Sequence, residues 1–297
     1  MNQPVKIFDH ALLQRRLSRA QTAGGENFLL PHVVEDFADR LAAIKRNFHQ
    51  ILDVGTTSAQ LSSELRRLFP DASVSHLAPV SSGMMANVET SRPLKTENLG
   101  LEPESLDLVT SALAFQAAND LPGLFTQIRR ALKPDGLFLG CLFGGQTLRE
   151  LRLAFAAAEA ELSGGASPRV APFADVRDLG GLLQRADLAL PVADIDTMTV
   201  RYADAFGLFR DLRAMGATNA LAQRSRQPLR RAVLMGAVEI YQKQFCDPDG
   251  RVRATFDIVW LSGWAPHESQ QSALKPGSAR MRLADVLPTK TYGDQPG

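Results

Sequence analysis

The spacing of apolar positions along the chain changes repeatedly between a helical period and short unbroken runs. Residues 9–22 and 28–46 carry apolar side chains at helical spacing, with Phe28 and Val33 among those of the second segment. The run at 50–55 is instead short and apolar and ends in turn residues. This pattern predicts two N-terminal helices followed by a buried parallel strand.

The rest of the chain, up to about residue 263, also alternates between short apolar runs and segments of helical spacing. Further strands are expected at 72–78, 93–98, 105–111, 137–143, 189–201 and 253–263. Further helices are expected at 58–69, 121–132, 147–162, 175–186, 203–214 and 228–245. Strands that alternate with helices through short turns predict an α/β fold with a doubly wound sheet.

The lengths of these segments suggest one main domain with additions. We expect an N-terminal helical extension at 1–46 and a main domain at 47–287. The helix and the Gly/Pro-rich loop after the fifth strand suggest an insertion at about 144–188. The glycines and prolines of 288–297 predict a flexible tail.

Composition narrows the functional classes. The 297 residues include 33 Lys plus Arg and 32 Asp plus Glu, a net charge of +1, which gives no reason to expect a nucleic-acid partner. Two cysteines, Cys141 and Cys246, exclude a disulfide scaffold, and the five scattered histidines predict no metal site. No apolar run is long enough to span a membrane. We therefore expect a soluble cytoplasmic protein, or one of the mitochondrial matrix if the source is eukaryotic.

The loop after the first predicted strand offers the first chemical signal. It reads Asp53-Val54-Gly55-Thr56-Thr57-Ser58-Ala59, and ligands of open α/β sheets bind beyond the carboxyl ends of such strands. The strand–DxG–helix order resembles the first motif of class I S-adenosylmethionine methyltransferases, usually DxGxGxG. Asp53 and Gly55 match that motif, whereas Thr57 and Ala59 stand where it has glycines. An ordinary strand-to-helix turn is the alternative interpretation of this loop.

Three further blocks carry a more specific resemblance. They are the segments at 143–152 (FGGQTLRELR), 165–183 (with GASPRVAPF and DLGGLL) and 263–270 (GWAPHESQ). Together they resemble the methyltransferase-like family of mitochondrial complex I assembly factor 5 and its alphaproteobacterial relatives, over about 8–287. The resemblance implies a seven-stranded, Rossmann-like class I methyltransferase sheet, N-terminal helices and an insertion after the fifth strand. It also implies arginine hydroxylation and a respiratory complex I subunit as protein partner. A more distant relative is the malonyl-carrier-protein methyltransferase.

The resemblance also indicates which residues would meet S-adenosylmethionine, and several depart from the family pattern. The cofactor-binding candidates are Asp53, Gly55, Thr57, Leu77 and Gln116. Leu77 takes the place of the acid that holds the ribose hydroxyls, and Gln116 stands where relatives have histidine. Lys95 replaces the aspartate near the adenine, with Glu97 two residues away. These replacements predict a degenerate motif and weakened cofactor binding.

The candidates for contact with a substrate or a partner lie mostly in the three blocks. They are Phe143, Gly144, Thr147, Arg152, Arg169, Trp264 and His267. Tight turns, core packing and structural ion pairs are the alternative interpretations of these residues. The sequence identifies no catalytic residue. Three hypotheses stay open: an enzyme that modifies a protein side chain, an inactive scaffold or assembly factor, and a methyltransferase for a small carboxylate.

Overall fold

A computed structural model of the chain describes residues 6–79, 91–93 and 97–271. The chain divides into two compact units, Met1–Pro266 and His267–Gly297. The first unit contains all the helices and strands described below.

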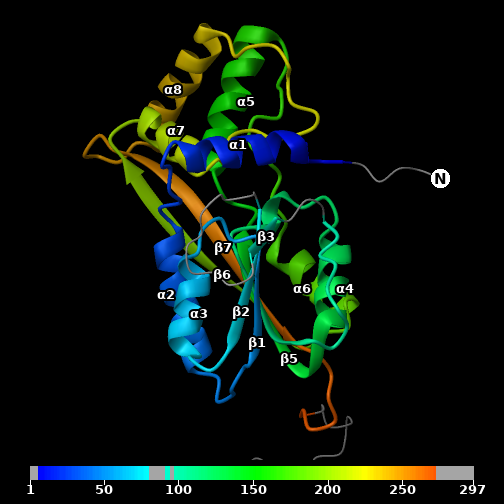
Figure 1. Ribbon diagram of the computed structural model, residues 1–297. Helices are drawn as coiled ribbons and strands as arrows, with labels where there is room; N and C mark the ends of the chain where they lie inside the picture. The colour runs from blue at the N-terminus through cyan, green and yellow to red at the C-terminus, as the bar shows by residue number, and fades with distance from the viewer. Residues whose placement is uncertain (1–5, 80–90, 94–96, 272–297) are drawn as a thin grey trace, which may run out of the picture. The chain divides into compact units, whose positions relative to one another are not determined.

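A seven-stranded sheet runs through the first unit, in the order β3-β2-β1-β4-β5-β7-β6 (Figure 1). The strands are β1 (Gln50–Val54), β2 (Ser73–Ala78), β3 (Ser91–Pro93), β4 (Leu106–Ala112), β5 (Leu132–Phe143), β6 (Ala189–Tyr202) and β7 (Val252–Trp264). The pairs from β3 to β5 are all parallel, whereas β7 is antiparallel to both β5 and β6. The predicted α/β doubly wound fold is therefore confirmed.

The helices divide between the two faces of the sheet and its carboxyl edge (Figure 1). They are α1 (His10–Thr22), α2 (Leu30–Ala42), α3 (Gln60–Leu68), α4 (Leu121–Ala131), α5 (Arg149–Ser163), α6 (Val176–Arg185), α7 (Ala205–Ala214) and α8 (Arg231–Phe245). Helices α2 and α3 cover one face, and α4 and α6 cover the other. Helices α1, α5, α7 and α8 gather at the edge where the parallel strands end, and we call these four helices the cap.

Burial of apolar side chains explains why both faces are covered. The last four residues of β1 are all buried, as expected for a strand with helices on both sides. Ile51 belongs to the apolar cluster shared with α2 and α3, and Leu52 to the cluster shared with α4 and α6. Alternate residues of a strand point to opposite faces, so one strand supplies both clusters.

The predicted elements match the structure except at two places. Strand β5 begins at Leu132, five residues before the predicted start at 137, because extended pairing with β4 begins directly after Ala131. Helix α4 ends at Ala131, one residue before the predicted end at 132, and Pro134 lies within β5. Strand β3 spans 91–93 rather than 93–98, and residues 94–96 lie outside the described part of the chain.

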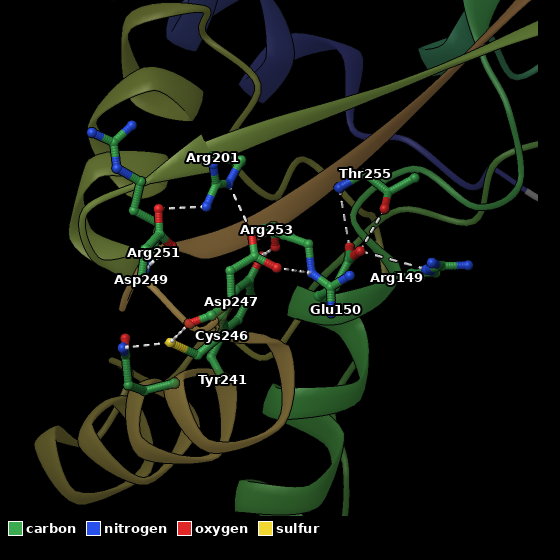
Figure 2. A network of polar contacts seen from close by, with 11 residues as sticks. Arg149, Glu150, Arg201, Tyr241, Cys246, Asp247, Asp249, Arg251, Arg253 and Thr255 are labelled. Carbon is green, nitrogen blue, oxygen red and sulfur yellow. Dashed lines mark hydrogen bonds and ion pairs between the residues drawn. The ribbon is translucent and has the colours of Figure 1, made fainter.

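A network of ion pairs fixes the turn between α8 and β7 (Figure 2). Arg201 donates hydrogen bonds to Asp247 at 2.7 Å and to Asp249 at 2.6 Å, which ties β6 to this turn. Arg253 of β7 contacts the other oxygen of Asp247 at 3.1 Å. Single exposed ion pairs contribute little to stability, but a shared carboxylate orders the turn.

A buried carboxylate joins the cap to the sheet in the same view (Figure 2). Glu150 of α5 is only 4% exposed and accepts hydrogen bonds from the hydroxyl and the amide of Thr255. Tyr241 of α8 is fully buried and donates to the carbonyl oxygen of Arg253 at 2.7 Å. Because both partners lie on β7, α5 and α8 are held in fixed positions over the carboxyl edge.

Candidate functional site

A cavity of about 800 Å³ lies between the carboxyl edge of the sheet and the cap. The loops after β1 and β4 form its sheet side, with Gly55, Thr57 and residues 113–118. Residues of α1, α5 and α7 and the segment 169–173 form its cap side. A concave, mostly pre-formed pocket of this size at the switch point of an α/β sheet is the usual place for a ligand.

The loop after β1 forms the tightest part of the cavity wall. Gly55 adopts φ +77°, and its amide donates to the carbonyl oxygen of Leu77 at 2.8 Å. A Cβ atom at Gly55 would lie 2.8 Å from the Cβ of Ala114, so both the turn and the packing require glycine. Thr57 lines the cavity, and its carbonyl oxygen accepts a hydrogen bond from Gln21 of α1 at 3.0 Å. Helix α1 is thereby fastened to this loop.

Asp53 does not face the cavity. Its side chain is fully buried and accepts hydrogen bonds from Thr56 and from Ser62, the latter at 3.0 Å. His76 is also fully buried, lies 3.8 Å from Asp53 and contacts the carbonyl oxygen of Thr56 at 2.9 Å. The carboxylate thus organises the loop from behind. Burial raises the pKa of Asp53 above its ordinary value, against the opposing effects of His76, Thr56 and Ser62.

Because the Asp53 carboxyl group is buried, the stability of the protein should depend on pH. A raised pKa in the folded state means that Asp53 favours folding when protonated, and that this contribution is lost as pH rises above about 3.9, the unfolded value. Asp53→Asn cannot ionise, so its free energy of unfolding relative to the wild type should increase with pH. Urea unfolding from about pH 4 to 7 measures this difference. Asp71→Asn, at an exposed position, serves as the control. Parallel stability curves for Asp53→Asn and the wild type would contradict the prediction.

Leu77 and Glu97 occupy different positions relative to the cavity. Leu77 is 3% exposed, packs in the apolar cluster on the α4 side and does not line the cavity, whereas Pro79 just beyond β2 does. Glu97 lines the cavity and is its only carboxylate among the described residues. His10 lies 3.2 Å from it, and the amide of Asn119 donates to it. Lys95 lies outside the described residues.

Asn119 forms hydrogen bonds with the segment that precedes α1. Its side-chain oxygen accepts from the amides of Ile7 and Phe8, each at 2.8 Å, and its nitrogen contacts His10 at 2.9 Å. On the other side, the amide of Asp9 donates to the carbonyl oxygen of Ala220 at 2.9 Å. The segment before α1 therefore connects the loop after β4 with the cap.

Gln116 combines a position at the cavity with an unsatisfied polar atom. Its amide nitrogen donates to the carbonyl oxygen of Leu113 at 2.7 Å. Its oxygen Oε1 is buried and has no hydrogen-bond partner, although the residue lines the cavity. Such an acceptor is costly to leave unpaired, so it is a natural contact for a donor on a ligand.

The turn after β5 is held by hydrogen bonds to β7. The hydroxyl of Thr147 donates to the carbonyl oxygen of Asp257 at 3.1 Å and accepts from its amide at 3.0 Å. A Cβ atom at Gly144 would lie 2.7 Å from a methyl group of Val259, so the glycine permits close packing. Phe143 and Thr147 line the cavity, whereas Gly144 does not.

The two predicted arginines also differ. Arg169 lines the cavity, and its Nε donates at 2.7 Å to Glu159, whose side chain is 4% exposed. Arg152 does not line the cavity and donates instead to the carbonyl oxygens of Gly145 and Thr147, at 3.4 and 3.2 Å. Both arginines support local structure, and Arg169 does so at the cavity wall.

Neither Trp264 nor His267 is among the residues that line the cavity. Trp264 pairs with Leu137, at the edge where the parallel strands begin, because β7 runs antiparallel to them. The residue that β7 contributes to the cavity is instead Phe256. His267 belongs to the second compact unit, where its Nδ1 contacts the hydroxyl of Ser269 at 2.8 Å.

The contribution of the cap helices to the cavity was not predicted from the sequence. Phe206, Phe209, Arg210 and Arg213 of α7 all line the cavity. Their spacing of three and four residues places them on one face of the helix, which was the available signal. His10 of α1 was missed as well, because its contact with Glu97 joins segments far apart in the sequence.

One group of potential metal ligands lies elsewhere among the described residues. The ligand atoms of His32, Asp36 and Asp196 all lie within 4.8 Å of one another. His32 is 3.7 Å from Asp36 and 3.9 Å from Asp196, so these contacts connect α2 with the edge strand β6. None of the three lines the cavity.

Comparison with known proteins agrees with this geometry. A family model described as "Methyltransferase domain" matches residues 52–140. The solved structure of the YcgJ protein from Bacillus subtilis has a TM-score of 0.53 at 13% identity, and covers 80% of this chain and 99% of that chain. The sheet order, the antiparallel β7 and the cavity beyond β1 define a class I S-adenosylmethionine methyltransferase fold.

Closer relatives define the family. The mitochondrial arginine-hydroxylase NDUFAF5 of Danio rerio is 35% identical over 96% of this chain and 90% of its own length. The malonyl-[acyl-carrier protein] O-methyltransferase of Gallionella capsiferriformans (strain ES-2) is 31% identical over 88% of this chain and 92% of its own. The chain belongs to the NDUFAF5 family of the class I methyltransferases. Among its described residues, no helix is long and apolar enough to cross a membrane.

Proposed function

We propose that this chain is an assembly factor that binds a protein partner and has a weakened S-adenosylmethionine site. By resemblance to its family, the partner is a subunit of respiratory complex I. The observation that carries the proposal is a contrast within the cavity. Hydrogen bonds hold its walls in place, but the loop after β1 and the acceptors around it are poorly suited to the cofactor.

The loop after β1 supports the first part of this contrast. Thr57 places a branched side chain at the cavity wall, where the family motif has glycine. Glycine there allows the backbone to approach a ligand closely, which a β-branched residue prevents. Of the three glycine positions of the motif, only position 55 holds glycine in this chain, and Gly55 adopts φ +77°.

The carboxylates support the second part. The ribose hydroxyls of the cofactor need an acceptor, but Leu77 is apolar and buried, and Asp53 is turned away into its own network. Glu97 is already engaged by His10 and Asn119. Each unpaired polar group costs about 1–3 kcal/mol, so two lost contacts weaken binding by roughly 10³-fold.

A titration and a complementation experiment test the proposal together. S-adenosylmethionine titrated into the purified chain should give no saturable heat at micromolar concentration. In cells that lack this gene, Thr57→Trp, which fills the cofactor end of the cavity, should still restore complex I assembly. Micromolar cofactor binding would overturn the weakened site, and failure of the wild-type gene to affect complex I would overturn the assembly role.

The alternative is an active methyltransferase that acts on a protein side chain or a small carboxylate. The name of the Gallionella relative supports the carboxylate version. However, Arg169, the arginine candidate from the sequence that lines the cavity, is already paired with Glu159. A carboxylate substrate would therefore have to use Arg210 or Arg213 of α7. Transfer of a labelled methyl group from S-adenosylmethionine to a complex I subunit or to a malonyl thioester would establish this alternative.

A further inference from the structure

We propose that the cap side of the cavity binds a small amphiphile, namely an apolar chain that carries one terminal anionic group. The proposal concerns a ligand of the cavity and goes beyond the role of a partner-binding assembly factor. It rests on three observations: an apolar lining, two arginines with unpaired side chains, and the lack of a free carboxylate among the described residues of the lining.

The lining of the cavity is unusually rich in aromatic side chains. Eight phenylalanines line it, from Phe8 before α1 to Phe256 of β7. At the cap side, the ring of Phe209 lies 5.8 Å from that of Phe206 and 6.3 Å from that of Phe155. These rings pack against one another along the cavity wall. An apolar ligand in the cavity would remove their exposed surface from water.

Helix α7 gives the cavity both its apolar wall and its charge. Phe206, Phe209, Arg210 and Arg213 all line it, and their spacing places them on neighbouring positions of one helix face. Phe206 is 38% exposed, and both arginines are exposed as well. This face therefore forms the mouth of the cavity, where an apolar interior meets solvent.

The positive charges of Arg210 and Arg213 are not neutralised by a neighbouring side chain among the described residues. Within the described part of the chain, the guanidinium groups of Arg210 and Arg213 form no ion pair and no hydrogen bond. Arg169, the other arginine of the lining, is neutralised by Glu159. A pair of free guanidinium groups beside an apolar opening attracts an anionic group and can hold a carboxylate or phosphate.

The charged side chains of the lining also disfavour a cationic ligand. A guanidinium or ammonium group needs a carboxylate partner when it is taken out of water. Glu97 is the only carboxylate among the described residues of the lining, and His10 and Asn119 already engage it. The charge of the cavity thus favours an anionic head group on the apolar chain.

Displacement of a fluorescent fatty acid from the full-length chain tests the proposal. The competitors are laurate, dodecyl phosphate and the uncharged dodecanol. Laurate, dodecyl phosphate or both should compete at a one-to-one ratio, and dodecanol should compete at least about tenfold less well. The two acids distinguish a carboxylate from a phosphate head group.

Two charge-matched double variants locate the site. Arg210→Gln with Arg213→Gln should weaken binding of the acids by about tenfold and leave dodecanol unchanged. Arg226→Gln with Arg230→Gln removes the same charge from exposed positions outside the lining and should change binding less than twofold. Ala171→Trp, which fills the cavity from its wall, should abolish binding of all three, with an unchanged circular dichroism spectrum as the folding check.

Three results would overturn the proposal. They are the absence of saturable binding by either acid, equal binding of dodecanol and the acids, and equal losses in the two double variants. None of these results depends on cofactor titration or complementation, so failure here is distinguishable from failure of the assembly role.

Discussion

The triple variant Thr57→Gly, Ala59→Gly and Pro79→Asp should bind S-adenosylmethionine roughly 10³-fold more tightly than the wild type. The first change removes the branched side chain from the cavity wall. The second affects Ala59, the N-cap residue of α3, where glycine is preferred to alanine. The third adds an acceptor at the end of β2. Isothermal titration calorimetry measures the difference directly.

The structure explains why the triple variant introduces its acceptor at position 79 and not at position 77. Leu77, the position that sequence comparison selects, is buried in the apolar core, so Leu77→Asp would bury an unpaired charge and destabilise the fold. Pro79 lines the cavity and is partly exposed. The double variant without Pro79→Asp separates the effect of clearance from that of the acceptor. A folded triple variant that still binds no cofactor would contradict the proposal that these three positions weaken the site.

Trp260→Ala should lower the free energy of unfolding by about 3–5 kcal/mol, the largest stability effect that we expect from a single change. Trp260 is 1% exposed at the centre of β7. Its ring packs edge-on against Phe37 at 4.8 Å, and the guanidinium carbon of Arg40 lies 4.3 Å from the ring centre. Alanine would leave a cavity between α2 and the sheet and remove both contacts.

Urea denaturation followed by circular dichroism measures this loss. Trp260→Phe keeps an aromatic ring against Phe37 and should cost much less than alanine. Trp264→Ala is the matched control, since Trp264 is only partly buried on the same strand. A loss below about 1 kcal/mol for Trp260→Ala, as for an ordinary surface substitution, would show that the ring is not a core anchor.

The sequence predicted the elements of the fold well because their signals are local. The unbroken apolar run of β1 and the helical spacing of α2 each reflect burial of one segment, and both were predicted to within a few residues. The end of α4 at Ala131 was likewise predicted to within one residue. The start of β5 was misplaced because pairing with β4, not local pattern, extends it to Leu132.

The cavity was only partly predictable, since its walls come from distant segments. Gly55, Thr57 and Gln116 were selected from the order of strand, loop and helix, and all three line it. Trp264 was selected from its place near a strand end, but the antiparallel direction of β7 puts it at the opposite edge. A strand's direction depends on its partners, which local spacing does not reveal.

Taken alone, the sequence determined the class of fold, the family and the departures of the loop after β1, because each depends on residue type and order. Only the tertiary structure decided which side chains face the cavity. It turned Asp53 into a buried network, placed Leu77 in the core and brought Arg210 and Arg213 of α7 to the mouth. The physical reason is that side-chain direction and partner choice follow from packing between segments far apart in the chain, where burial and pairing are satisfied together.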